Sequence, residues 1–152
     1  MIIERATLAD KDVLLDLMQK QFLEHEIPHS AGILEAAIRE MITRDSLGII
    51  LVARDDDHVI GLAAIPFAWT LEYGGKSAWL DELYVLPEHR GAGIGSLLVD
   101  SVLVEAEKEG CIAVDLEVEA EHQRVEQLYA RKGFRRLDRS RWVKQIKRLT
   151  SR

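Results

Sequence analysis

Hydrophobic residues recur every three or four positions in four stretches of the chain, the spacing that gathers side chains on one face of a helix. The first stretch follows Thr7 and Asp10 and the second follows Ser30, residue types whose side chains cap the start of a helix. The helices predicted from this spacing cover residues 13–22, 33–42, 94–105 and 123–132.

Between these stretches lie shorter runs that are rich in β-branched or aromatic residues and are bounded by turn residues. They predict strands over residues 2–4, 48–53, 59–69, 77–85 and 112–118, with closing strands at Phe134 and over 142–146. The resulting order, β-α-α-β-β-β-α-β-α-β-β, predicts a mixed α/β fold with helices interposed among the strands of one central sheet. No stretch of the chain reads as a linker, so we expect a single domain over residues 1–152.

The composition is that of a globular protein, since 47% of the 152 residues are hydrophobic and 30% are charged. The chain has 20 lysines and arginines against 26 aspartates and glutamates, which gives a formal net charge of −6. This balance argues against a nucleic-acid partner, because displacing counterions from phosphates requires a basic surface. A neutral or cationic small molecule fits the charge better.

Cysteine usage and the apolar runs indicate where the protein works. The single Cys111 excludes an intrachain disulfide and a cysteine-based zinc cluster, and it favours a reducing compartment. Charged residues at Glu4, Arg5 and Asp10 interrupt the N-terminus, so no secretory signal is expected there. The longest apolar run, residues 59–69, is far shorter than the roughly 20 residues that span a bilayer. We therefore expect a cytoplasmic protein with no membrane partner and no metal.

The segment with the most chemical information is a predicted strand that runs through Leu86 into a glycine-rich turn and then a helix. The turn reads Arg90-Gly91-Ala92-Gly93-Ile94-Gly95-Ser96. Such a turn directs several backbone N–H groups and the positive end of a helix dipole at one point, which is where a phosphate or pyrophosphate binds. A purely structural strand-to-helix turn is the alternative interpretation.

Two known phosphate-binding motifs fit this turn poorly. A P-loop has lysine before the Ser or Thr at the helix start, whereas Gly95 stands directly before Ser96 here. A dinucleotide-binding fingerprint is approximated by Gly91, Gly93 and Ser96, with Asp115 or Glu117 about twenty residues further on. The polar residues 87–90 before the first glycine, and the short chain that follows, count against this second motif.

The turn resembles the Q/R-x-x-G-x-G/A motif of the GNAT superfamily of N-acetyltransferases, and residues 83–89 resemble the strand and lead-in that precede that motif. About thirty residues later, Leu128-Tyr129-Ala130-Arg131-Lys132-Gly133-Phe134 resembles the L-Y-x-x-x-G-F signature of the same superfamily. The order and spacing of the motifs agree with the resemblance, and so does the predicted order of elements. His122 and Val125 depart from the asparagine and alanine that members often carry at these positions.

The resemblance implies acetyl-CoA as co-substrate. Its pyrophosphate would lie on the backbone amides of the turn, at Arg90, Gly91, Ala92, Gly93, Ile94, Gly95 and Ser96. The backbone of Leu83, Tyr84 and Val85 would pair with the pantetheine arm as an added strand does, and the Val85 N–H would stabilise the oxyanion. Tyr129 would contact the departing sulfur, either handing it a proton or stabilising its charge.

The acceptor implied by the resemblance is an amine, which must lose a proton to a carboxylate or through a water before it attacks. Asp81 is the first candidate for this base or for an amine anchor, Glu82 the second and Glu117 the third. Strand alternation places Asp81 and Val85 on one face of the strand and Glu82 on the opposite face, unless a bulge intervenes. A working base would need a pKa raised by partial burial.

The resemblance also implies that the first two helices shape the acceptor site. The stretch that contains them has four glutamates: Glu24, Glu26, Glu35 and Glu40. Together with Asp81 and Glu82 they predict an acidic funnel for a small cationic amine, such as a polyamine or aminoglycoside. A protein or peptide N-acetyltransferase and a non-catalytic acetyl-CoA-binding module remain as alternative functions. The resemblance further implies a homodimer, because members of the superfamily often dimerise.

Overall fold

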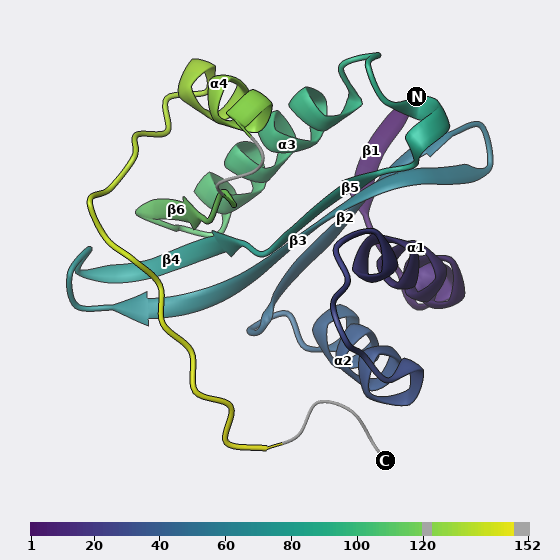
Figure 1. The fold of residues 1–152 in the computed structure, drawn as a ribbon, viewed down its shortest axis with the longest axis horizontal. Coiled ribbons are helices and arrows are strands. Elements are labelled where there is room, and N and C mark those ends of the chain that lie inside the picture. The colour runs from purple at the N-terminus through teal and green to yellow at the C-terminus, as the bar shows by residue number, and fades with distance from the viewer. Residues whose placement is uncertain (120–122, 148–152) are drawn as a thin grey trace.

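A computed structural model describes residues 1–119 and 123–147 of the chain. In this part of the chain six strands form one sheet, in the order β1-β2-β3-β4-β6, with β5 also paired to β3 (Figure 1). The strands are β1 (Ile2–Arg5), β2 (Gly48–Asp55), β3 (His58–Thr70), β4 (Gly75–Leu80), β5 (Glu82–Val85) and β6 (Ala113–Leu116). All pairs are antiparallel except β4 and β6, which run parallel. The mixed α/β fold expected from the sequence is confirmed.

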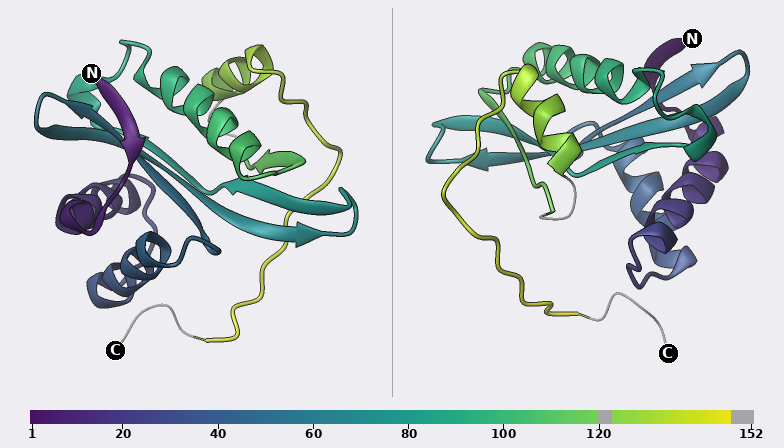
Figure 2. Two further views of the ribbon diagram at one scale, coloured as in Figure 1. Left: turned by 180° about the vertical axis from the view of Figure 1, so that it is seen from behind. Right: turned by 45° about the horizontal axis from the view of Figure 1, so that its top comes forward.

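Helices cover both faces of this sheet, two on each side (Figures 1 and 2). They are α1 (Lys11–Glu24), α2 (Ala31–Thr43), α3 (Ile94–Lys108) and α4 (Gln123–Arg131), with short 3-10 turns at Leu8–Asp10 and Pro87–His89. Helices α1 and α2 pack on one face, and α3 and α4 lie over the other. All four helices lie where the spacing of apolar residues predicts them. No helix in the described ranges is long and apolar enough to cross a membrane.

Strand β2 shows why the central strands are apolar on both faces. Its Ile49 and Leu51 belong to the core beneath α3, whereas Ile50 and Val52 belong to the core against α1 and α2. Side chains alternate across a strand, so a strand covered on both faces needs an unbroken apolar run. This explains why β2 has no hydrophobic–polar alternation although both of its neighbours in the sheet are antiparallel to it.

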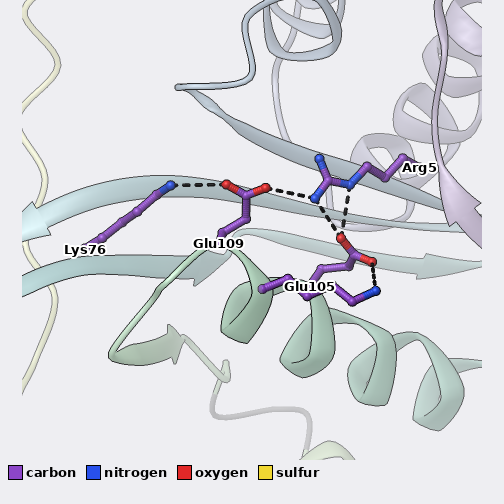
Figure 3. Close-up of polar contacts among 5 residues, drawn as sticks. Arg5, Lys76, Glu105 and Glu109 are labelled. Atoms are coloured by element: carbon purple, nitrogen blue, oxygen red, sulfur yellow. Dashed lines mark hydrogen bonds and ion pairs between the residues drawn. The ribbon is translucent and has the colours of Figure 1, made fainter.

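An ion-pair network ties the edge of the sheet to the end of α3 (Figure 3). Arg5 on β1 donates through Nη2 to Glu105 at 2.8 Å and to Glu109 at 2.9 Å, both on or next to α3. Lys76 on β4 lies 3.3 Å from the other carboxylate oxygen of Glu109. The network joins three elements that are distant in sequence, and its partial exposure limits each pair to a modest stabilisation.

The sheet divides at Asp81, where the sequence predicted one continuous strand over 77–85. Ala78 on β4 pairs with Phe67 of β3, but Glu82 on β5 pairs with Ala64, so one extra residue lies between these two registers. The Asp81 N–H also donates to the Ala64 carbonyl at 3.0 Å, which marks a β-bulge. Beyond the bulge β5 stays with β3 alone among the described strands, while β4 ends beside β6.

The two closing strands expected from Phe134 and from residues 142–146 are absent from the described residues. Residues 134–147 run as an extended segment without a strand partner, past the β3–β4 hairpin (Figure 2). Ion pairs, instead of a hydrogen-bond ladder, connect this segment to the sheet: Arg139 with Glu72 and Arg141 with Glu117. Apolar residues alone do not make a strand, because a strand also needs a neighbour for its backbone groups.

Candidate functional site

The main-chain edge of β5 that faces away from β3 is not paired with any described strand. Leu86 donates to the Ile60 carbonyl at 2.9 Å, and the alternation of an antiparallel pair then turns the N–H and C=O groups of Leu83 and Val85 outward. Side chains reach the two carbonyls, since Arg90 Nε lies 2.8 Å from Val85 O and Gln21 Nε2 lies 3.5 Å from Leu83 O. The outward N–H groups form an edge to which an extended ligand can add.

The glycine turn joins this edge to the start of α3. Gly91 and Gly93 have φ values of 84° and 82°, a left-handed conformation that side chains with a Cβ adopt only at a cost. Gly93 is the N-cap of α3 and supplies no side-chain hydrogen bond, so the first N–H groups of the helix are not capped by it. A Cβ built on Gly95 would meet no protein atom within 4 Å. The turn therefore presents backbone N–H groups to open space, as anion binding requires.

Open space beside the turn is also visible as a surface hollow of about 390 Å³. Four residues of the turn region line it: His89, Arg90, Ala92 and Ile94. The rest of its lining comes from Met1, Asp55, Ile60 and Glu88. The lining does not include Tyr129, Asp81 or Glu82, so the hollow adjoins the turn without reaching the carboxylates.

The side chain of Arg90 points back from the turn to α1. Its Nη2 lies 3.1 and 3.0 Å from the two carboxylate oxygens of Glu24, and its guanidinium stacks 5.3 Å from the Tyr84 ring centroid. The Tyr84 hydroxyl donates to the same carboxylate at 2.9 Å. Although burial raises the pKa of Glu24, the hydrogen bonds from Arg90 and Tyr84 outweigh it and hold that pKa below its usual value. The side chain of Arg90 is thus a clamp between the turn and α1.

Tyr129 on α4 is 8% exposed and belongs to the core beneath α3, against which Leu83 and Val85 also pack. Its ring meets Phe134 edge to face, with the centroids 5.7 Å apart. Burial raises the pKa of the Tyr129 phenol above its ordinary value, so the phenol stays neutral at physiological pH. The tyrosine and the phenylalanine of the L-Y-x-x-x-G-F signature therefore hold Tyr129 on the same face of the sheet as the side chains of Leu83 and Val85.

Glu82 carries the most strongly perturbed carboxylate of the candidate site. Burial raises its pKa to about 7, and the neighbouring charge of Asp81 adds to the shift, while a hydrogen bond from the Gln21 side chain opposes it. Burial also raises the pKa of Asp81, although the charge of Arg141 and a hydrogen bond from Trp79 oppose the rise. Both candidate carboxylates are therefore less acidic than in water, and Glu82 is half protonated near neutral pH.

Gln21 is a site residue that sequence reasoning missed. It is 7% exposed on α1, and its Oε1 is a buried acceptor with no hydrogen-bond partner in the described residues. Buried acceptors without a partner are costly, which makes such an atom a candidate for ligand contact. A glutamine on the otherwise apolar, core-facing side of a predicted helix was the available signal.

The remaining acidic candidates lie in other surroundings. Glu117 follows β6 and pairs with Arg141 at 2.8 Å. Asp115 accepts a hydrogen bond of 2.7 Å from the Tyr73 hydroxyl. Its strand belongs to a mostly antiparallel sheet, so the dinucleotide-binding alternative, which needs a parallel sheet, is wrong.

Three of the four glutamates of the expected acidic funnel are paired with cations. Glu24 pairs with Arg90 at 3.0 Å, Glu35 with Lys11 at 2.9 Å and Glu40 with Arg44 at 3.2 Å. These pairs reduce the negative charge that the first two helices offer to a ligand. Of the two departures from the family pattern, Val125 packs against the core beneath α3, and His122 lies outside the described residues.

The chain is similar to several curated proteins over part of their length. An uncharacterized N-acetyltransferase of Mycobacterium bovis is 31% identical over 105 residues, which are 69% of this chain and 64% of that protein. A thialysine N-epsilon-acetyltransferase of Bos taurus is 33% identical over 75 residues, which are 49% of this chain and 44% of that protein. The chain thus spans less than two thirds of the length of either relative.

Solved structures share the fold over nearly the whole chain. An integron cassette protein from the mobile metagenome of Cole Harbour Salt Marsh has a TM-score of 0.86 at 22% identity, covering 96% of this chain and 91% of that one. A predicted acetyltransferase of Clostridium acetobutylicum, crystallised with acetyl-CoA, has a TM-score of 0.78 at 19% identity, covering 95% and 94%. At these identities the likeness concerns the fold.

A sequence profile agrees with the motifs and the fold. The profile described as the Acetyltransferase (GNAT) family matches residues 12–134, a range that contains the point where the sheet divides, the glycine turn and Tyr129. This chain belongs to the GNAT family of acetyltransferases.

Proposed function

We propose that residues 1–152 form one acetyltransferase domain that transfers the acetyl group of acetyl-CoA to the primary amine of a small cationic acceptor. The observation that carries this proposal is the division of the sheet at Asp81. It leaves the outward edge of β5 between a glycine turn suited to pyrophosphate and a half-buried carboxylate, Glu82, with a pKa of about 7. Further support comes from the solved relative crystallised with acetyl-CoA and from the relative named for a thialysine N-epsilon amine.

Acetyl-CoA would bind through backbone groups of this chain. The N–H groups of residues 91–96 would hold the pyrophosphate, helped by the positive end of the α3 dipole, whereas the Arg90 N–H, which the sequence also suggested, already donates to the Pro87 carbonyl at 3.3 Å. The outward main-chain groups of Leu83 and Val85 would pair with the amides of the pantetheine arm. The Val85 N–H is the donor proposed for the oxyanion, and the Arg90 contact to the carbonyl of the same residue holds this peptide segment in place.

Glu82 is the proposed base, in preference to Asp81, because its pKa lies near physiological pH. The acceptor arrives mainly as an ammonium, and Glu82 removes one proton to release the nitrogen lone pair. The unpartnered Oε1 of the buried Gln21 would accept a hydrogen bond from a second N–H of the acceptor, a contact that an alcohol without a spare N–H would not match.

The transfer itself forms the C–N bond of the amide and breaks the C–S bond of the thioester. The second proton of the nitrogen leaves with the sulfur, so the products are the N-acetylated acceptor, CoA thiol and one proton passed from Glu82 to solvent. The pKa of a phenol already lies above that of a thiol and burial raises it further, so Tyr129 is proposed to act as a neutral hydrogen-bond donor to the developing thiolate and to keep its own proton.

Cofactor binding and acetyl transfer can be tested separately. Thermal shift with acetyl-CoA, CoA and NAD should show stabilisation by the two CoA compounds and none by NAD. Mass spectrometry after incubation with acetyl-CoA and a panel of diamines, polyamines, aminoglycosides and lysine should then show a gain of one acetyl group. If neither CoA compound raises Tm, the proposed cofactor site is wrong.

The same assay with peptides added to the panel distinguishes the alternative functions. Acetylation of peptides but of no small amine would support the protein-modifying alternative. Binding of CoA without any acetylated product, from peptides or small amines, would support a non-catalytic module. The expected homodimer stays a prediction, which light scattering measures.

A further inference from the structure

The guanidinium of Arg141 lies at the point where the sheet divides. Arg141 belongs to the extended segment 134–147, which comes back to the sheet after α4. Its Nη1 lies 2.8 Å from Glu117 Oε2, and its Cζ lies 4.8 Å from the centroid of the Trp79 ring. A positive charge from a distant part of the chain is therefore seated on an aromatic face and paired with a carboxylate.

Strand register explains why these groups meet. Leu80 at the end of β4 is paired with Leu116 at the end of the parallel strand β6. The next residue on each strand is acidic, Asp81 on one and Glu117 on the other, and Trp79 precedes this pair. The Trp79 side chain hydrogen-bonds to Asp81, on which the charge of Arg141 also acts. The ends of two adjacent parallel strands thus place two carboxylates and an indole around one cation.

This combination is the one that proteins use to bind organic cations. An indole face attracts a guanidinium or ammonium through its quadrupole, and carboxylates add charge-assisted hydrogen bonds. The Arg141–Glu117 pair is easily displaced, since its side chains are 58% and 49% exposed and exposed ion pairs contribute little. A ligand cation can therefore compete with Arg141 for the same position.

A second, independent observation lies directly beside this position. Glu82 follows Asp81 in the chain, and the buried Gln21 Oε1 near it has no partner in the described residues. The unpartnered acceptor calls for a ligand N–H donor at the buried position, while the position at Trp79 takes a second positive charge. The two positions adjoin each other through consecutive residues of one strand.

We propose that Trp79, Asp81 and Glu117 form a subsite for a second positive group of the acceptor, and that Arg141 fills this subsite when no acceptor is bound. The acceptor class is then a molecule with a primary amine and a further guanidinium or ammonium. The assignment of this charge to the acceptor rests on the proposed function. Acceptor binding exchanges one cation for another, so the free protein leaves neither the indole face nor the carboxylates without a partner.

Binding of agmatine, which carries a primary amine and a guanidinium, tests the subsite without acetyl-CoA. The Trp79 indole N–H signal, assigned through Trp79→Phe, reports the titration by NMR. Arg141→Gln removes the internal competitor and should tighten agmatine binding about fivefold or more. Arg139→Gln is the matched control, because Arg139 lies on the same segment but pairs with Glu72. It should bind agmatine as the wild type does.

The subsite also predicts how further changes behave. Glu117→Gln placed in the Arg141→Gln background should weaken agmatine again by about the same factor. Butylamine, which lacks the second charge, should be insensitive to Arg141→Gln. Unchanged or weaker agmatine binding in Arg141→Gln would overturn the proposal.

Catalysis separates this inference from the proposed function. Tighter agmatine binding in Arg141→Gln without acetyl transfer to any amine would contradict the proposed function and support the subsite. Acetylation of agmatine whose KM is the same in Arg141→Gln and wild type would support the function and contradict the subsite.

Discussion

Arg90 at the start of the glycine turn donates to both carboxylate oxygens of Glu24 at the end of α1, at 3.1 and 3.0 Å. The same guanidinium holds the Val85 carbonyl at 2.8 Å. One side chain thus links the turn proposed for pyrophosphate, the strand edge proposed for pantetheine and the helix that carries Gln21. The contact couples the position of α1 to the cofactor side of the site.

Replacing Glu24 should therefore weaken cofactor binding although this residue is not proposed to touch the cofactor. Glu24→Gln removes the charge that holds the guanidinium, so we expect the Kd for CoA to rise about threefold to tenfold, as loss of a charge-assisted hydrogen bond would produce. Isothermal titration with CoA measures this change. Glu40→Gln, whose partner Arg44 is the residue that ends α2, should leave the Kd unchanged. An equal effect of the two variants would contradict the coupling.

The half-buried Glu82 predicts the pH dependence of the rate. Its pKa of about 7 means that kcat/KM for an amine acceptor should rise with pH and reach half of its plateau near pH 7. Glu82→Gln should lower kcat/KM about a hundredfold and remove this inflection. A pH–rate profile of both proteins measures it. An inflection that persists in Glu82→Gln but disappears in Asp81→Asn would move the role of base to Asp81.

The same carboxyl should make folding stability depend on pH. Its pKa is raised from 4.5 to about 7 in the folded protein, so the neutral form is the one that the fold favours. Below pH 4.5 the group is neutral in both states and costs nothing, whereas above pH 7 it is charged in both states and the full cost applies. The shift corresponds to about 3 kcal/mol. Glu82→Gln should therefore gain stability over wild type as pH rises from 4 to 8, as urea unfolding would measure.

Gly95 should affect cofactor binding and stability in opposite directions. It is the second residue of α3, and a Cβ there meets no protein atom within 4 Å, so Gly95→Ala should stabilise the helix by about 0.5–1 kcal/mol. The added methyl group would occupy space proposed for the pyrophosphate and should raise the Kd for CoA. Gly32→Ala, at the second position of α2 and equally open, should stabilise the protein without changing that Kd. Thermal unfolding and isothermal titration check both effects.

Tyr129→Phe should lower kcat about tenfold to a hundredfold, because it removes a neutral donor from a developing thiolate in a buried place. The Kd for CoA should change little, since the aromatic packing on Phe134 is retained. Tyr73→Phe is the control, because the Tyr73 hydroxyl donates to Asp115 and not to the proposed site. A wild-type kcat for Tyr129→Phe would exclude the tyrosine from sulfur departure.

Several of these features are readable from the sequence because they are local. The helical spacing of apolar residues over 13–22, the Gly91–Gly93 turn and the signature around Tyr129 are each confined to a short stretch of the chain. Their physical causes, amphipathic spacing and left-handed glycine conformations, need no knowledge of the rest of the fold. The sequence did not decide whether a bulge lies at Asp81, because an extra residue in a strand is recognised only from its register with the partner strand.

The fold class, the family and the glycine turn proposed for pyrophosphate follow from the sequence alone, since each depends on short-range patterns of residue type. The tertiary structure was needed to show which carboxylate is desolvated, that Arg90 pairs with Glu24 and that Arg141 stacks on the Trp79 ring. Those outcomes depend on which distant segments pack together: the half-buried Glu82 is hydrogen-bonded by Gln21 of α1, and Arg141 returns to the sheet after α4. Desolvation and charge pairing are properties of neighbours in space, so a pattern along the chain does not encode them residue by residue.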